Sequence, residues 1–91
     1  MKWYVISYDL NSPGQNYSKL YEKIKSIANG WCKVLESVWI IGHNGNARTI
    51  HDQLIVAMDK SDRLFVSEMT SDHWWTLSQA SANWFKENVK F

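Results

Sequence analysis

The chain has 91 residues, a length that suits one domain. Ten Lys and Arg residues against nine Asp and Glu residues leave a formal net charge of +1, so the composition lacks the strong basic excess that is typical of nucleic-acid-binding domains. A single cysteine, Cys32, excludes an intramolecular disulfide and a thiolate zinc site. No segment approaches the roughly 20 apolar residues that span a bilayer, and the first ten residues are too polar for a signal peptide. We therefore expect a cytoplasmic protein with no membrane partner.

The aromatic content is high, with six tryptophans, four tyrosines and three phenylalanines. Each ring can bury about 150–250 Å². A domain this short cannot easily enclose all of them in one core. Some of these rings are therefore predicted to lie at a homodimer interface or in a binding groove.

The first half of the chain predicts a strand, a turn and a helix. Residues 3–10 are rich in Tyr, Val and Ile, as expected of a strand. Alternation places Tyr4, Ile6, Tyr8 and Leu10 on one face, and Trp3, Val5, Ser7 and Asp9 on the other. Ser12-Pro13-Gly14 indicates a turn. The helix that follows carries one apolar stripe, with Asn16 or Ser18 as its cap and Asn29-Gly30 as its end: Tyr17, Leu20, Tyr21, Ile24, Ile27 and Ala28.

The second half begins with residues 31–42, which predict either two short strands or one strand bent at Glu36-Ser37. Residues 47–58 predict a helix capped by Asn46, and residues 63–70 predict a strand. Residues 71–78 are ambiguous. Residues 79–90 predict a third helix whose inward side chains are Ala80, Trp84, Phe85 and Val89.

This element order predicts an α+β fold of the ferredoxin-like βαββαβ type, in which two helices cover one face of an antiparallel sheet. A C-terminal helical extension follows. The expected organisation is a single domain over residues 1–91, with a core at 1–70 and the extension at 71–91. The second sheet face carries Trp and Val side chains, so a partner subunit or the C-terminal extension is expected to cover it.

Asp9, at the end of the first strand, has two interpretations. It lies with Ser7 on the face turned away from the helices, where a two-fold axis would bring two copies of Asp9 together. Paired carboxylates can hold a divalent cation that acts in phosphoryl transfer. Alternatively, Asp9 accepts hydrogen bonds from turn amides at Asn11 or Ser12, and position alone favours this structural role.

Histidines and tryptophans are the remaining candidates. His43, His51 and His73 lack metal-ligand spacing. His51 is expected to be solvated on its helix, whereas His43 lies in a loop at a strand end, where functional side chains are frequent. Trp74-Trp75 is consistent with base stacking, although aromatic pairs in small dimers more often anchor interfaces.

Two short motifs carry a family resemblance. The Tyr8-Asp9 strand end and the Ser37-Val38-Trp39 motif resemble the small CRISPR-associated adaptation endoribonuclease family, whose superfamily includes the RNase toxin virulence-associated protein D. The tail, residues 74–91, is similar to bacterial and phage proteins labelled SinR-family. The resemblance implies a ferredoxin-like homodimer with Asp9 of each subunit near the two-fold axis, a divalent metal and phosphodiester hydrolysis.

The first functional hypothesis is a Mg²⁺- or Mn²⁺-dependent endonuclease, expected to act on RNA in a toxin or defence setting. Asp9 is the catalytic and metal-binding candidate. Its supporting candidates are Ser7, Asn11 and His43, and Lys19 and Lys23 are the candidates for phosphate contact.

The second hypothesis is a catalytically inactive homodimer that binds nucleic acid, a nucleotide or a protein through Trp3, Trp74 and Trp75. The balanced charge and the surplus of tryptophans motivate it, and two departures from the family pattern count against the nuclease. Residues 11–16 replace the family's arginine- and lysine-rich segment, and the overall charge is nearly neutral.

Overall fold

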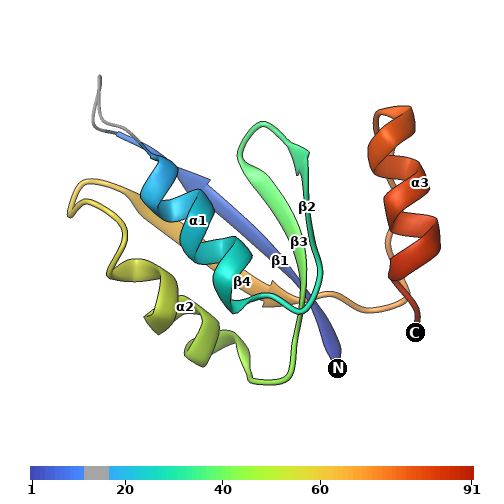
Figure 1. Ribbon diagram of the computed structural model, residues 1–91, viewed down its shortest axis with the longest axis horizontal. Helices are drawn as coiled ribbons and strands as arrows, with labels where there is room; N and C mark the ends of the chain where they lie inside the picture. The colour runs from blue at the N-terminus through green and yellow to red at the C-terminus, as the bar shows by residue number, and fades with distance from the viewer. Residues whose placement is uncertain (12–16) are drawn as a thin grey trace.

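The computed structural model describes residues 1–11 and 17–91. In chain order, the elements of this part are β1 (Lys2–Asp9), α1 (Ser18–Ile27), β2 (Trp31–Leu35), β3 (Val38–His43), α2 (Ala47–Ile55), β4 (Arg63–Glu68) and α3 (Gln79–Asn88). The strands form one antiparallel sheet in the order β2-β3-β1-β4. Figure 1 shows α1 and α2 on one side of this sheet and α3 on the other. The α+β class and the antiparallel sheet expected from the sequence are therefore confirmed.

Several element boundaries differ from those expected. The 31–42 segment forms two strands joined at Glu36-Ser37, with a register shift between Lys33 and Leu35. α2 ends at Ile55 and α3 at Asn88, earlier than predicted. No helix in the described part of the chain is long and apolar enough to cross a membrane.

The caps agree with the sequence in one helix. Asn46 caps α2 as predicted, because its Oδ1 accepts the Thr49 backbone N–H at 2.8 Å. In α1, Ser18 is the first helical residue and Tyr17 occupies the N-cap position. The alternative cap, Asn16, and the predicted turn at 12–14 lie outside the described residues.

The first hydrophobic core lies between the sheet and the two helices α1 and α2. Its strand residues come from the predicted helix-facing side of β1, namely Tyr4, Ile6 and Tyr8. Alternate residues of β3 and the apolar stripes of both helices complete it: Trp39, Ile41, Leu20, Ile24, Ile50 and Leu54. The alternation of the first strand therefore assigned its two faces correctly.

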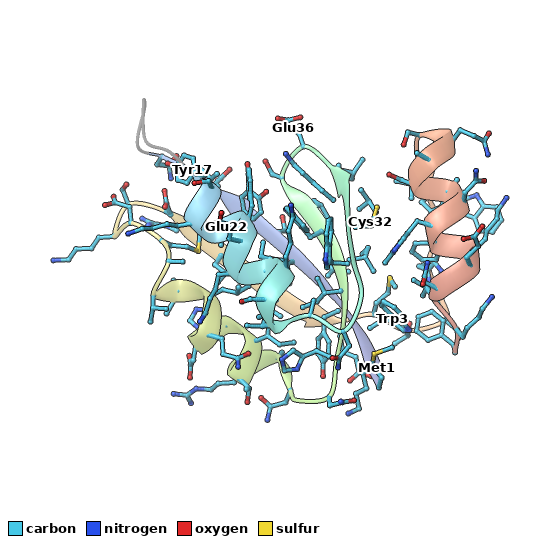
Figure 2. All side chains as sticks on the ribbon, in the orientation of Figure 1. Met1, Trp3, Tyr17, Glu22, Cys32 and Glu36 are labelled. Atoms are coloured by element: carbon cyan, nitrogen blue, oxygen red, sulfur yellow. The ribbon has the colours of Figure 1, made fainter. Side chains whose placement is uncertain are left out.

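A second hydrophobic core lies on the opposite sheet face. Trp3 and Ile40 are buried there against Phe85 and Val89. The Trp3 and Trp84 rings meet edge to face at 5.9 Å. Figure 2 shows the Cys32 side chain directed from β2 towards α3, where its Sγ lies 3.6 Å from the Ser81 hydroxyl. The C-terminal extension thus covers part of the second sheet face, which is one of the two coverings predicted from the sequence.

The inward face of α3 is shifted from its prediction. Ala80 is exposed, whereas Ser81 and Ala82 face inward with Phe85 and Val89. The prediction of Ala80 as an inward residue was therefore wrong. The observed inward positions are spaced by three or four residues from Phe85, so they form one helical stripe.

Tyr8 carries the largest pKa shift in the described part of the chain. Burial raises the pKa of Tyr8 to about 12, and the Tyr21 phenol and the Glu36 carboxylate add to this effect. The Trp39 indole Nε1–H donates to the Tyr8 hydroxyl oxygen at 2.9 Å, in a buried hydrogen bond that acts in the opposite direction. Tyr8 therefore enters the first core as a neutral phenol.

Tyr8→Phe is expected to destabilise the protein by about 1–3 kcal/mol near pH 8, because the buried Trp39 N–H loses its acceptor. An unfolded tyrosine ionises near about pH 10. The folded parent keeps its Tyr8 proton to about pH 12. Between these pH values the Tyr8 phenol ionises only in the unfolded chain, which lowers the free energy of unfolding of the parent protein. Tyr8→Phe has no phenol at this position and does not show this decrease.

Urea unfolding of both proteins from pH 8 to 12 measures the difference between them. The stability advantage of the parent should shrink above pH 10. An advantage that stays constant to pH 12 would contradict the raised pKa.

Candidate functional site

The end of β1 that carries Asp9 is not covered by α3. α3 packs over β2 and reaches Trp3 and Ile40. The strand register instead places Arg63 of β4 opposite Asp9, and Phe65 of β4 opposite Ser7. Asp9 and Arg63 are exposed, and Phe65 is 68% exposed. Sheet pairing therefore gathers a carboxylate, a guanidinium and an apolar ring on one uncovered surface.

This surface is hollowed. A depression of about 320 Å³ is lined by side chains that include Ser7, Asp9, Arg63 and Phe65. Arg63 Nη1 donates to the carbonyl oxygens of Ser61 at 3.3 Å and Asp62 at 3.2 Å. These bonds use only part of the five-donor guanidinium, which is well suited to bind phosphate. The hollow can therefore present a carboxylate and a phosphate-binding cation to one ligand.

The structural interpretation of Asp9 as an acceptor for Asn11 is wrong. The Asn11 backbone N–H donates to Asp62 Oδ1 at 2.9 Å instead. Ser12, the other proposed donor, lies outside the described residues. Within residues 1–11 and 17–91, no hydrogen bond or ion pair of the Asp9 side chain is present. Its carboxylate is therefore exposed towards the hollow and solvent.

Asp62 performs the structural role that the sequence assigned to Asp9. Asp62 is 5% exposed, and its carboxylate accepts the Asn11 and Asp59 backbone N–H groups, each at 2.9 Å. The Tyr17 hydroxyl donates to it at 3.4 Å. Asp62 thereby connects the 59–62 segment to Asn11, two residues after the end of β1. The sequence analysis treated this segment only as a polar connection, although an aspartate just before a strand was a usable signal.

Two supporting candidates are engaged elsewhere. The Asn11 side-chain amide donates to the Ser61 carbonyl at 2.9 Å. His43 pairs with Lys2, at the far end of β1 from Asp9 and roughly 20 Å along the strand. Its Nδ1 accepts the Gly45 N–H at 2.8 Å, and its Nε2 lies 3.2 Å from Gln53 Oε1. Of the three supporting candidates, only Ser7 lines the Asp9 hollow.

The two lysine candidates lie in the helix layer. Lys19 and Lys23 belong to α1 and line a separate surface hollow that also contains Val56 and Ala57. The sheet separates α1 from the face that carries Asp9. One protomer therefore does not bring these lysines to Asp9.

The donor set for a metal is small. In the part of the chain that the structure describes, no three His, Cys, Asp or Glu side chains lie close enough together to hold a metal ion. Asp9 alone contributes one carboxylate per protomer. Mg²⁺ is often held by one or two carboxylates, with water and substrate phosphate filling the other positions. An Asp9 pair across a dimer fits that chemistry, whereas an isolated protomer does not supply a complete site.

The three tryptophan candidates have different environments. Trp3 is 4% exposed beneath α3, so the chain's own extension occupies this predicted interface residue. Trp75 is half-buried, with its ring 5.2 Å from that of Phe85. Trp74 is 98% exposed and borders a hollow of about 540 Å³ that also contains Phe85 and Lys86. Trp74 is therefore the candidate that remains available to a partner.

Comparison of the chain with models of known protein families, with characterised proteins and with experimentally determined structures found no match.

Proposed function

We propose that the protein is a homodimeric, metal-dependent endonuclease that acts on RNA, with Asp9 as its metal ligand, in a toxin or defence setting. The observation that carries this proposal is the exposed Asp9 carboxylate opposite Arg63 on an uncovered part of the sheet. Exposure leaves Asp9 free to bind a cation. The proposed location is the cytoplasm.

The proposed fold type is ferredoxin-like. In sequence order the first six elements are strand, helix, strand, strand, helix and strand. Taken from the β4 edge, the strand order is 4-1-3-2 and every neighbouring pair is antiparallel. The two helices α1 and α2 contribute to the same core. These three features support a split βαβ arrangement.

The proposed dimer forms through the uncovered part of the sheet face. Phe65 is 68% exposed and Leu35 is 53% exposed, and Val38 lies opposite Ser7 in the neighbouring strand. Exposed apolar side chains of this kind are typical of an interaction surface. A two-fold axis through this surface would bring the two Asp9 carboxylates towards each other.

The proposed chemistry divides the work among three side chains. The Asp9 carboxylates hold Mg²⁺ or Mn²⁺, which when bound supplies positive charge to the phosphodiester and lowers the pKa of a water molecule. Arg63 binds a non-bridging phosphate oxygen through its free N–H groups. The Ser7 hydroxyl donates a hydrogen bond to the substrate bound in the same hollow.

The test is cleavage of single-stranded RNA by the purified protein, with Mn²⁺ or Mg²⁺ compared with EDTA. We expect cleavage that depends on the metal and a mass in solution equal to that of a dimer. A monomer, or a dimer that cuts no RNA or DNA with either metal, would contradict the proposal.

A second candidate function is a catalytically inactive dimer that binds a nucleic acid, a nucleotide or a protein. The exposed Trp74 ring beside a hollow that is also lined by Trp75 and Phe85 favours it, because a group of apolar side chains at the surface is typical of an interaction site. This function predicts that Asp9 can be replaced without loss of binding, whereas Trp74 cannot.

A further inference from the structure

The C-terminal extension builds a groove that is separate from the Asp9 hollow. Its larger part, of about 540 Å³, lies between the 71–75 segment and α3. The Trp75 and His73 rings each lie 5.2 Å from the Phe85 ring and form an aromatic wall. Trp74 stands beside this wall and is 98% exposed. The volume is within the range of pockets that hold small organic ligands.

The groove continues towards the chain termini. A neighbouring hollow of about 390 Å³ shares Ser71 with the first and is lined by residues that include Lys2, Lys90 and Phe91. His73 links the two parts, because its ring also lies 5.4 Å from that of Phe91. Exposed aromatic rings therefore recur along one continuous surface.

Two lysines lie along this surface. Lys86 lines the first hollow and Lys90 the second. In the described part of the chain, no carboxylate forms an ion pair with either lysine. The one carboxylate that lines the second hollow, Glu68, lies 3.7 Å from the Lys2 ammonium and is offset by it. The groove therefore attracts an anionic ligand.

Aromatic rings beside lysines are an arrangement by which proteins bind single-stranded nucleic acid, since bases stack on the rings and phosphates pair with the cations. The Lys90 ammonium donates one hydrogen bond to the Lys86 carbonyl at 2.6 Å and has further N–H groups for a phosphate. Trp74 offers an open ring in solvent, which suits an unpaired base.

We propose that this groove binds single-stranded nucleic acid, with a base stacked on Trp74 and the backbone phosphates held by Lys86 and Lys90. This inference goes beyond the proposed nuclease, because it assigns a binding site away from Asp9 that needs no metal.

The experiment uses the full chain carrying Asp9→Asn, in EDTA, so that cleavage cannot affect the result. Fluorescence anisotropy is measured with labelled oligo-dT and oligo-rU of about 12 nucleotides, and with a duplex of the same length. We expect dissociation constants of about 1–100 µM for the single strands and binding at least about 10-fold weaker for the duplex.

Single substitutions then locate the site. Trp74→Ala should weaken binding by about 10-fold or more, and Trp74→Phe should restore most of it. Trp31→Ala is the matched control, because Trp31 is 40% exposed but packs against Trp39 on the helix side. Lys86→Gln should lower the slope of log affinity against log salt concentration by about 1, because one phosphate contact is lost. Lys60→Gln, at an exposed position outside the groove, should leave this slope unchanged.

Three results would overturn the proposal: no binding of either single strand at protein concentrations above about 100 µM, equal affinity for the duplex, or unchanged affinity in Trp74→Ala. A preference for RNA or for DNA would support it and identify the polymer. If the protein binds single strands but the parent protein does not cut RNA, the groove proposal stands and the nuclease proposal fails.

Discussion

Phe85→Ala is expected to lower the free energy of unfolding by about 3–5 kcal/mol, the usual range for removing a buried phenylalanine. Phe85 is 6% exposed and is the α3 residue around which the second core is built. The rings of Trp75 and His73 each lie 5.2 Å from it. The substitution therefore leaves a cavity where three separate segments meet.

The size of this effect follows from how α3 is held. A domain of this length is stabilised by only about 5–10 kcal/mol in total. If α3 separates from the sheet, Trp3 and Ile40 become exposed, and each costs about 1.5–3 kcal/mol when it returns to water. Undocking of α3 is therefore expected to be coupled to unfolding of the sheet.

Urea unfolding followed by circular dichroism measures this loss. Phe65→Ala is the matched control, because it removes the same ring from a position that is 68% exposed. Its effect should stay within about 0.5 kcal/mol at protein concentrations where the chain is monomeric. A loss below 1 kcal/mol in Phe85→Ala, or equal losses in the two variants, would contradict the second core.

The sequence predicted the first core well because alternation and helical periodicity are local signals. The two faces of β1, the apolar stripe of α1 and the Asn46 cap all depend on neighbouring residues, and each was found as expected. The second core was harder to predict. Trp3 and Phe85 are far apart in the chain, so no local pattern shows that they pack in the same core. The sequence indicated that a partner subunit or the C-terminal extension must cover the open face, but not which residues would meet there.

In the candidate site too, local patterns were predictable from the sequence, whereas contacts between residues distant in the chain were not. Alternation predicted that Ser7 and Asp9 share the face away from the helices, and both line one hollow there. Arg63 was missed, because only the β1–β4 register places it opposite Asp9. His43 was a supporting candidate for the Asp9 site because it was expected in a loop at a strand end. Because β1 and β3 are antiparallel, Asp9 and His43 lie at opposite ends of the sheet, measured along the strands.

The exchange of roles between Asp9 and Asp62 has a simple physical cause. Both aspartates lie at a strand boundary, where each can accept backbone N–H groups. Only Asp62 is buried, and its two carboxylate oxygens meet N–H donors from both sides of the β1–β4 pair. Sequence alone could not rank the two, since burial decides which carboxylate must be satisfied by hydrogen bonds.

Asp9→Asn is expected to abolish the proposed metal-dependent cleavage, with a loss of about 100-fold or more, while the proposed dimer persists. An amide of the same size keeps the shape of the surface but removes the negative charge that a hard divalent cation requires. Asp9 is exposed, so the substitution should change the free energy of unfolding by no more than about 0.5 kcal/mol. The variant should therefore lose cleavage activity but keep its free energy of unfolding.

Cleavage rates with Mn²⁺, unfolding curves and the mass in solution are measured for the parent and for Asp9→Asn. Asp52→Asn is the matched control, because Asp52 is an exposed aspartate of α2 that pairs with His51 and Arg48 on the helix side. It should cut RNA at the parent rate. If Asp9→Asn retains parental cleavage, a different side chain binds the metal. If both variants lose cleavage equally, the effect lies in overall charge and not at the end of β1. The proposed site is supported only if Asp9→Asn alone is inactive and remains a folded dimer, since that result ties the chemistry to the one carboxylate that the sheet presents opposite Arg63.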